Sequence, residues 1–162
     1  MRILRGKRGQ TLASAVVATV LLLVIASGLV DGLNLLSTKQ RCLEVASAAS
    51  LRGVSRGRNY SYYLSTGQIG LDVSAAQDEA INAIDGGLTG MGLSGYTVQV
   101  EVLDTPGGGS IPNFPPGRTW TETEPSVGVY LVVPVDTFLM GLINGGGLVD
   151  VHVFAAAGVA TQ

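Results

Sequence analysis

The sequence predicts an α+β fold in which one long N-terminal helix packs on a small antiparallel sheet with one short extra helix. We expect the lower half of the long helix to be transmembrane and its upper half amphipathic. Three observations support this fold class: no charged residue stands between Gly9 and Val30, apolar residues then continue at helical spacing to about Arg52, and strand-like alternation dominates the second half of the chain. A sheet of few strands needs an element to cover its apolar face, and the amphipathic part of the helix can supply it.

The apolar run has the length of a membrane span. Its twenty residues from Thr11 to Val30 would rise about 30 Å as a helix, which matches the hydrocarbon core of a bilayer. A basic cluster precedes the run and places the N-terminus in the cytoplasm; it consists of Arg2, Arg5, Lys7 and Arg8. We therefore expect a basic cytoplasmic leader at 1–10, a single span of the inner (cytoplasmic) membrane at 11–30, and an extracytoplasmic α+β domain at 53–162.

A cleaved secretory signal is the alternative interpretation of the same run, with a cut at Ala26 or Gly28. Against it, the residues that follow keep the helical spacing of apolar side chains without a turn or polar break; they are Leu29, Leu33, Leu36, Leu43, Ala46 and Ala49. A cut would therefore divide one helix, which from Thr11 to Arg52 would be about 63 Å long. Its leucines are expected to cover the sheet.

The end of the apolar run contains a G-x-x-x-G pattern formed by Gly28 and Gly32, with Asp31 between them. Such a pair lets another backbone approach closely, so it is a candidate helix-packing site. Glycine and aspartate also weaken helices, and the three residues can equally mark the exit from the membrane.

A second, shorter helix is predicted after the basic, glycine-rich segment 52–60. Ser74 and Gln77 have the spacing of a capping box, and Asp85-Gly86-Gly87 is expected to end the helix.

Three strands are predicted next, at 96–104, 127–133 and 148–160, with Pro134 closing the second strand. The segment 105–118 is expected to be an irregular loop. The segment 136–147 is expected to be a helical turn capped by Asp136. Its apolar residues 138–143 either cover the core or form an exposed tip that meets the membrane or a partner.

Catalytic chemistry is not indicated. His152, the only histidine, lies in an alternating strand and is expected to form a surface cross-strand pair, and Cys42, the only cysteine, is expected to be a buried thiol. No phosphate-binding loop, metal-ligand spacing or nucleophile motif is present. We therefore predict a protein that is not an enzyme, with no catalytic residues, no cofactor and no metal site.

Charge is distributed unevenly along the chain. Residues 1–58 hold nine of the ten Lys and Arg and only two acids, whereas residues 59–162 hold ten acids and Arg118. Arginines and tyrosines mix in the segment 52–63, and its position beyond a helix favours a solvated, charged helix end over a nucleic-acid surface. Contacts with lipid headgroups or with the acidic domain of a neighbouring subunit are the alternative. We expect no nucleic-acid partner.

The two ends of the chain resemble the TadE/TadG-like pilus-assembly family of Tad/Flp type IV pilus systems. Arg8-Gly9-Gln10 leads into the span as in that family, and Asp31-Gly32 marks its exit. The continuation LEVASAASLRGVSRG and the closing VVPVDTFLMGLI and LVDVHVFAAAGVA are also similar, while the middle of the chain has no counterpart. The resemblance implies a pilin-like fold and a non-enzymatic, membrane-held subunit or minor pseudopilin. Its implied partners are the membrane, copies of itself or other pilin-like subunits, a prepilin peptidase and the pilus-assembly platform.

The resemblance also implies a cleavage site for the peptidase, between Gly9 and Gln10. The family usually has glutamate at the fifth residue after that glycine, where this chain has Ser14. An uncut, permanently anchored protein is therefore the alternative. The residues expected to mediate packing and assembly of the helix are Ser14, Gly28, Leu29, Asp31, Gly32, Leu33, Leu36 and Leu43. The competing function is a single-pass anchored or secreted domain for binding or adhesion.

Overall fold

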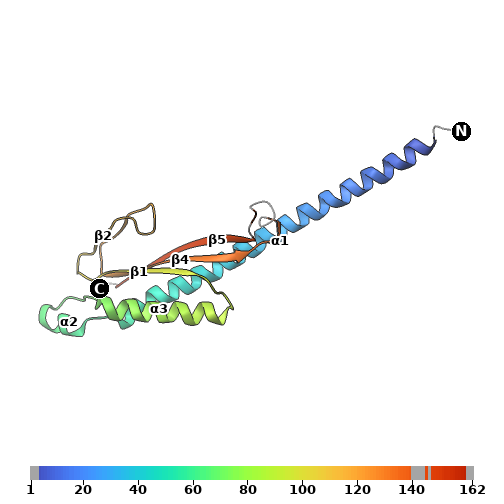
Figure 1. Ribbon diagram of the computed structural model, residues 1–162. Coiled ribbons are helices and arrows are strands. Elements are labelled where there is room, and N and C mark those ends of the chain that lie inside the picture. The colour runs from blue at the N-terminus through green and yellow to red at the C-terminus, as the bar shows by residue number, and fades with distance from the viewer. Residues whose placement is uncertain (1–3, 140–144, 146, 160–162) are drawn as a thin grey trace. The chain divides into compact units, whose positions relative to one another are not determined.

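The computed structural model describes residues 4–139, 145 and 147–159, and it confirms the predicted α+β class. Within these described residues, three helices, α1 (Leu4–Arg56), α2 (Tyr60–Thr66) and α3 (Val73–Gly90), accompany five strands (Figure 1). The strands are β1 (Thr97–Leu103), β2 (Gly109–Ile111), β3 (Trp120–Glu122), β4 (Ser126–Asp136) and β5 (Leu148–Gly158). The chain forms two compact units. We call Met1–Leu36 with Asp136–Val149 the N-terminal unit, and Ser37–Val135 with Asp150–Gln162 the sheet unit.

The sheet unit is built on a three-stranded sheet with the order β1-β4-β5. β1 pairs antiparallel with β4, from Thr97 opposite Val132 to Leu103 opposite Ser126. Alternate valines and leucines of the central strand are buried, as expected for the strand with a neighbour on each side; they are Val127, Val129, Leu131, Val133 and Val135. Figure 1 shows α3 and the C-terminal part of α1 lying along the same side of this sheet.

Small residues lie where these two helices pack closely on each other. A Cβ added at Gly53 of α1 would lie 2.9 Å from the carbonyl oxygen of Ala76 and 3.3 Å from the Cβ of Ala80, both in α3. The same added Cβ would lie 3.2 Å from Val127 of β4, so α1 reaches the sheet at this point. At Gly87 of α3, an added Cβ would meet Val45 of α1 at 2.9 Å. The close approach of the helices therefore depends on residues with little or no side chain.

The opposite side of the unit has a smaller aromatic core, which the sequence did not predict. Phe114 and Trp120 pack edge to face with ring centroids 5.7 Å apart, and each also packs on Phe154 of β5. Gly128 of β4 lies beneath them, since an added Cβ would be 2.7 Å from Phe114 and 2.9 Å from Trp120. The segment predicted to be an irregular loop contains β2, and β2 pairs with β3.

Several predicted boundaries are wrong for identifiable reasons. The N-cap of α3 is Asp72, not Ser74, because the Asp72 carboxylate accepts a hydrogen bond from the Ala75 N–H at 3.1 Å. This helix continues through the glycines at 86 and 87 to Gly90, and position 87 requires glycine because an added Cβ would lie 2.9 Å from Val45.

Pro134 lies inside β4 instead of ending it. The pairing with β1 stops at Val132, so the missing N–H of Pro134 removes no hydrogen bond to that neighbour. The seven-residue helix α2, capped by Asn59, was not predicted at all.

Candidate membrane-anchoring and assembly site

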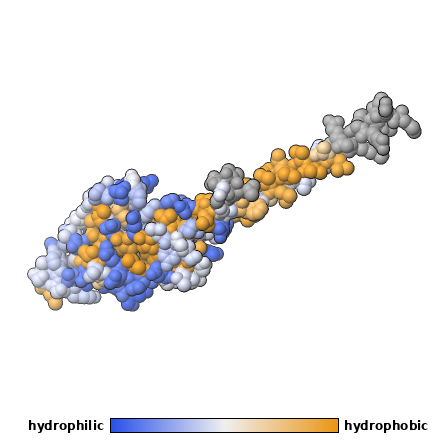
Figure 2. All heavy atoms as spheres, in the orientation of Figure 1, coloured by the Kyte–Doolittle hydropathy of each residue, from blue (hydrophilic) through white to orange (hydrophobic). Residues whose placement is uncertain are grey.

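The N-terminal part of α1 presents apolar side chains on every side. Nine of them are between 47% and 69% exposed: Leu12, Val16, Val17, Val20, Leu21, Leu22, Leu23, Val24 and Ile25. They include six consecutive residues, which point in all directions around a helix. The helix is long and apolar enough to cross a membrane. Figure 2 shows this surface in orange along the visible side of α1.

Two polar side chains of this helical segment are satisfied inside the helix. The hydroxyl of Thr19 donates to the carbonyl oxygen of Ala15 at 2.9 Å, and the hydroxyl of Ser27 donates to the carbonyl oxygen of Leu23 at 2.8 Å. Because hydrocarbon offers no hydrogen-bond partners, such internal bonds are what a membrane-spanning helix requires of its hydroxyl groups.

Asp31 holds the segment that follows β4. Its carboxylate accepts hydrogen bonds from the N–H of Phe138 at 3.0 Å and from the N–H of Leu139 at 2.6 Å. Asp31 is only 5% exposed, and one helical turn before it Gly28 lies beside Leu139, whose Cδ2 would be 3.4 Å from an added Cβ. We call Gly28, Asp31, Phe138 and Leu139 the Asp31 clasp; all four belong to the N-terminal unit.

The clasp corrects one sequence prediction. The carboxylate that accepts the first amides of the turn comes from Asp31, 107 residues before Phe138 in sequence, and not from the adjacent Asp136. Of the predicted turn 136–147, residues 140–144 and 146 lie outside the described residues, as does most of the apolar segment 138–143. β4 corresponds to the second predicted strand, 127–133, but continues to Asp136 and leads directly to Phe138 of the Asp31 clasp.

The predicted packing residues fall into different environments. Gly28 and Asp31 contact Leu139 and Phe138 within the Asp31 clasp, whereas a Cβ added at Gly32 would meet nothing within 4 Å. Ser14 lies on the exposed part of α1. The backbone of Gly9 and Gln10 is helical, and cleavage between them stays a prediction.

The four leucines of the predicted site are solvent-exposed, with values of 64%, 68%, 60% and 45% for Leu29, Leu33, Leu36 and Leu43. The prediction that they cover the sheet is therefore wrong. In the sheet unit the fully buried positions of α1 are small residues, Cys42, Ala46, Ala49 and Ser50, because bulkier side chains would hold α1 away from α3 and the sheet. The leucines remain available for contacts outside the molecule.

Cys42 is fully buried, as predicted, and burial raises the pKa of its thiol. His152 forms the predicted cross-strand pair: its Nδ1 shares a hydrogen bond of 2.7 Å with the hydroxyl of Tyr130 on β4, and the rings stack. Within the described residues, no three His, Cys, Asp or Glu side chains are grouped to hold a metal ion.

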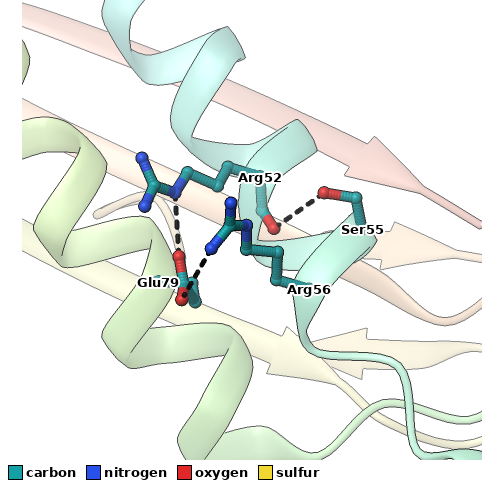
Figure 3. A network of polar contacts seen from close by, with 4 residues as sticks. All are labelled: Arg52, Ser55, Arg56 and Glu79. Carbon is teal, nitrogen blue, oxygen red and sulfur yellow. Dashed lines mark hydrogen bonds and ion pairs between the residues drawn. The ribbon is translucent and has the colours of Figure 1, made fainter.

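Two arginines of the basic segment are used inside the sheet unit. Arg52 donates to Glu79 of α3 at 2.8 Å through its Nε, and Arg56 lies 3.7 Å from the other carboxylate oxygen of Glu79 (Figure 3). The hydrogen bond from Arg52 is the main reason that the pKa of Glu79 is lowered. These arginines therefore link the end of α1 to α3, a contact that the sequence did not predict.

No family model, curated protein or solved structure matches this chain. The functional features that sequence reasoning missed are the Asp31 clasp and the close approach at Gly53. The sequence does contain a signal for the close approach at Gly53. Ala46, Gly53 and Gly57 are small residues at helical spacing, and Ala76 and Ala80 repeat that spacing in α3.

Proposed function

We propose that this protein is a membrane-anchored, pilin-like subunit or minor pseudopilin of a Tad/Flp-type pilus that works without catalysis and assembles through its N-terminal helix. One observation carries the proposal: α1 exposes apolar side chains on all sides over its N-terminal part and continues unbroken into the helix that helps form the core of the sheet unit. Leaving nine such side chains in water would cost on the order of 10 kcal/mol. Lipid, or the same helices of other subunits, would remove that cost.

The order of elements also supports the proposal. A single helix of 53 residues is followed by a small antiparallel sheet, and the helix supplies small residues to the core while keeping its leucines outside. In a filament held by helix packing, those leucines are the side chains free to contact neighbouring subunits. The expected location is a single pass through the cytoplasmic membrane, N-terminus inside, with later incorporation into a surface filament.

The test is to place a charge in the proposed span. Val20→Lys is expected to remove the protein from the membrane fraction or to abolish its co-purification with other subunits, because a lysine at the centre of a span costs about 2.5–3.5 kcal/mol. Leu64→Lys, at an exposed position of α2, is the matched control and should leave both unchanged. Normal membrane association and assembly of the Val20→Lys protein would refute the proposal.

A secreted binding or adhesion domain is the second candidate, and one observation favours it. The partly covered face of α1 begins at Ser27 and Gly28, so a chain cut after Ala26 would keep every residue of that face. The intact mass of the protein from its native membrane separates the candidates. A start at Gln10 supports a processed pilin, a start at Met1 supports a permanent anchor, and a start at Ser27 or Leu29 supports secretion.

A further inference from the structure

We propose that the Asp31 clasp holds Phe138 against the outer surface of the bilayer, so that the protein contacts lipid at a second, interfacial site beside its span. The inference rests on the proposed membrane anchoring by α1. It assigns a lipid-contacting role to a segment more than 100 residues away from the span in sequence, and a positioning role to Asp31.

The first argument is the exposure of Phe138. Its side chain is 75% exposed although its N–H is bonded to a buried carboxylate, so the backbone is held while the ring points away from the protein. Leu148, at the other end of the same segment, is also exposed. The N–H of Thr137 donates to the carbonyl oxygen of Gly147 at 2.8 Å, which ties these two ends together. Two large apolar side chains, Phe138 and Leu148, are thus exposed next to these hydrogen bonds, as at interfacial membrane contacts.

The second argument is the place of Asp31 on α1. It directly follows Val30, the last residue of the expected span, and a carboxylate at the edge of hydrocarbon is costly unless it is hydrogen-bonded. The two N–H groups of Phe138 and Leu139 provide those bonds, and Asp31 in turn satisfies two backbone donors at the start of a turn. The clasp therefore holds the backbone of Phe138 and Leu139 beside the residue that follows the expected span.

The third argument identifies lipid as the occupant. No charged residue stands between Asp136 and Asp150, so this segment offers no electrostatic complementarity to a charged protein or nucleic acid. The exposed apolar surface of α1 from Leu12 to Ile25 belongs to the same compact unit. A bilayer that holds the whole expected span, residues 11–30, ends beside Asp31, whose carboxylate accepts the hydrogen bond from the N–H of Phe138.

The experiment uses the full chain in liposomes. In a Cys42→Ala background, Phe138→Cys is labelled with an environment-sensitive fluorophore and tested with two quenchers, nitroxide-bearing lipids and aqueous iodide. Val20→Cys is the reference for the span, and Leu64→Cys, which is 84% exposed, is the reference for water. Quenching at 138 by lipid nitroxide, close to the level at 20 and well above that at 64, is the expected result.

Each other outcome overturns the inference. Iodide quenching at 138 equal to that at 64 would mean that the ring faces water, and shielding from both quenchers would mean that a second copy or another protein covers it. In both cases lipid quenching at 20 would leave the proposed anchoring intact. If position 20 is not quenched by lipid, the anchoring itself fails, so the two failures are distinguishable.

Asp31 is tested as a positioning residue in the same assay. Asp31→Asn keeps one acceptor oxygen and Asp31→Ala keeps none, so lipid quenching at 138 should fall in that order while quenching at 20 stays constant. The fluorescence of Trp120, the only tryptophan, reports whether the sheet unit is still folded. Unchanged quenching at 138 in the Asp31→Ala protein would refute the role of Asp31.

Discussion

Gly57, the residue after α1, lies directly against Ala76 of α3: a Cβ added to the glycine would be 2.5 Å from the Cβ of the alanine. No real pair of side chains occupies that distance, so the chain can pass α3 at this point only with glycine at position 57. Together with Gly53 one turn earlier, it permits the end of α1 to lie on α3.

Gly57→Ala should therefore destabilise the sheet unit. The added methyl group must displace α3 or the end of α1, and overpacking of this kind costs about 1–3 kcal/mol. Gly86→Ala is the matched control, because its added Cβ meets nothing within 4 Å and alanine is the better helix former by about 1 kcal/mol. Chemical unfolding of the full chain in detergent, followed by Trp120 fluorescence, measures the free energy of unfolding. This free energy should be higher for Gly86→Ala than for the parent protein and lower for Gly57→Ala. Equal stabilities would contradict the close approach.

The aromatic core predicts a second effect of glycine. Gly128→Ala would place a methyl group where the rings of Phe114 and Trp120 now lie, and should cost about 1–3 kcal/mol for the same reason. Because Trp120 is one of the displaced rings, its emission should also shift toward that of water-exposed tryptophan. The Gly57→Ala protein provides the comparison, since it should lose stability without this shift in the folded state. An unchanged emission spectrum would show that the rings do not rest on β4 at this residue.

The ion pair of Glu79 predicts a pH dependence. Arg52 lowers the pKa of this carboxyl in the folded protein below its ordinary value of 4.5, so the bond contributes stability above about pH 4.5 and loses it as the pH falls through the lower folded-state value. Glu79→Gln should therefore reduce stability at neutral pH but have a smaller effect in acid. Asp78→Asn, at an exposed neighbouring position, is the matched control for the removal of one carboxylate from α3, and the effect of Glu79→Gln is measured relative to it. Thermal unfolding at low salt, from neutral to acidic pH, measures the stability of both variants. If Glu79→Gln lowers the stability by the same amount at every pH, the role of the Glu79 charge is refuted.

The exposed leucines predict a separation between folding and assembly. Leu33→Lys should leave the unfolding transition almost unchanged, because the side chain is exposed and surface substitutions usually change stability by less than about 0.5 kcal/mol. The same change should weaken association between subunits, as measured by cross-linking in the membrane. Gln40→Lys is the control on an exposed polar position of α1 and should assemble normally. Full cross-linking of the Leu33→Lys protein would remove this leucine from the assembly surface.

Regular, strongly patterned elements were predictable from the sequence. The alternation in 96–104 corresponds to β1, and the apolar run 148–160 corresponds to β5, because one period describes each of them over its length. The long helix was also predictable, and it ends at Arg56, close to the expected Arg52. In these cases local pattern and tertiary environment agree.

Other features depend on partners far away in the sequence. The bonds of Asp31 join residues more than 100 positions apart, and the need for glycine at position 87 of α3 arises from Val45 of α1. The leucines of α1 were assigned to the wrong role because large apolar residues are usually the buried ones. Here close helix packing requires alanine and glycine on the buried face, and the spacing of small residues in α1 and α3 was the sequence signal for it.

The face of α1 that contains Cys42, Ala46, Ala49 and Gly53 has an evolutionary consequence. A larger residue at any of these positions would be selected against in every descendant of this protein, whatever filament or surface it served, because the fold itself would suffer. The leucines of the same helix are under no such constraint from the fold. Among relatives, we expect the small positions to remain small and the leucine positions to vary together with the subunits that they contact.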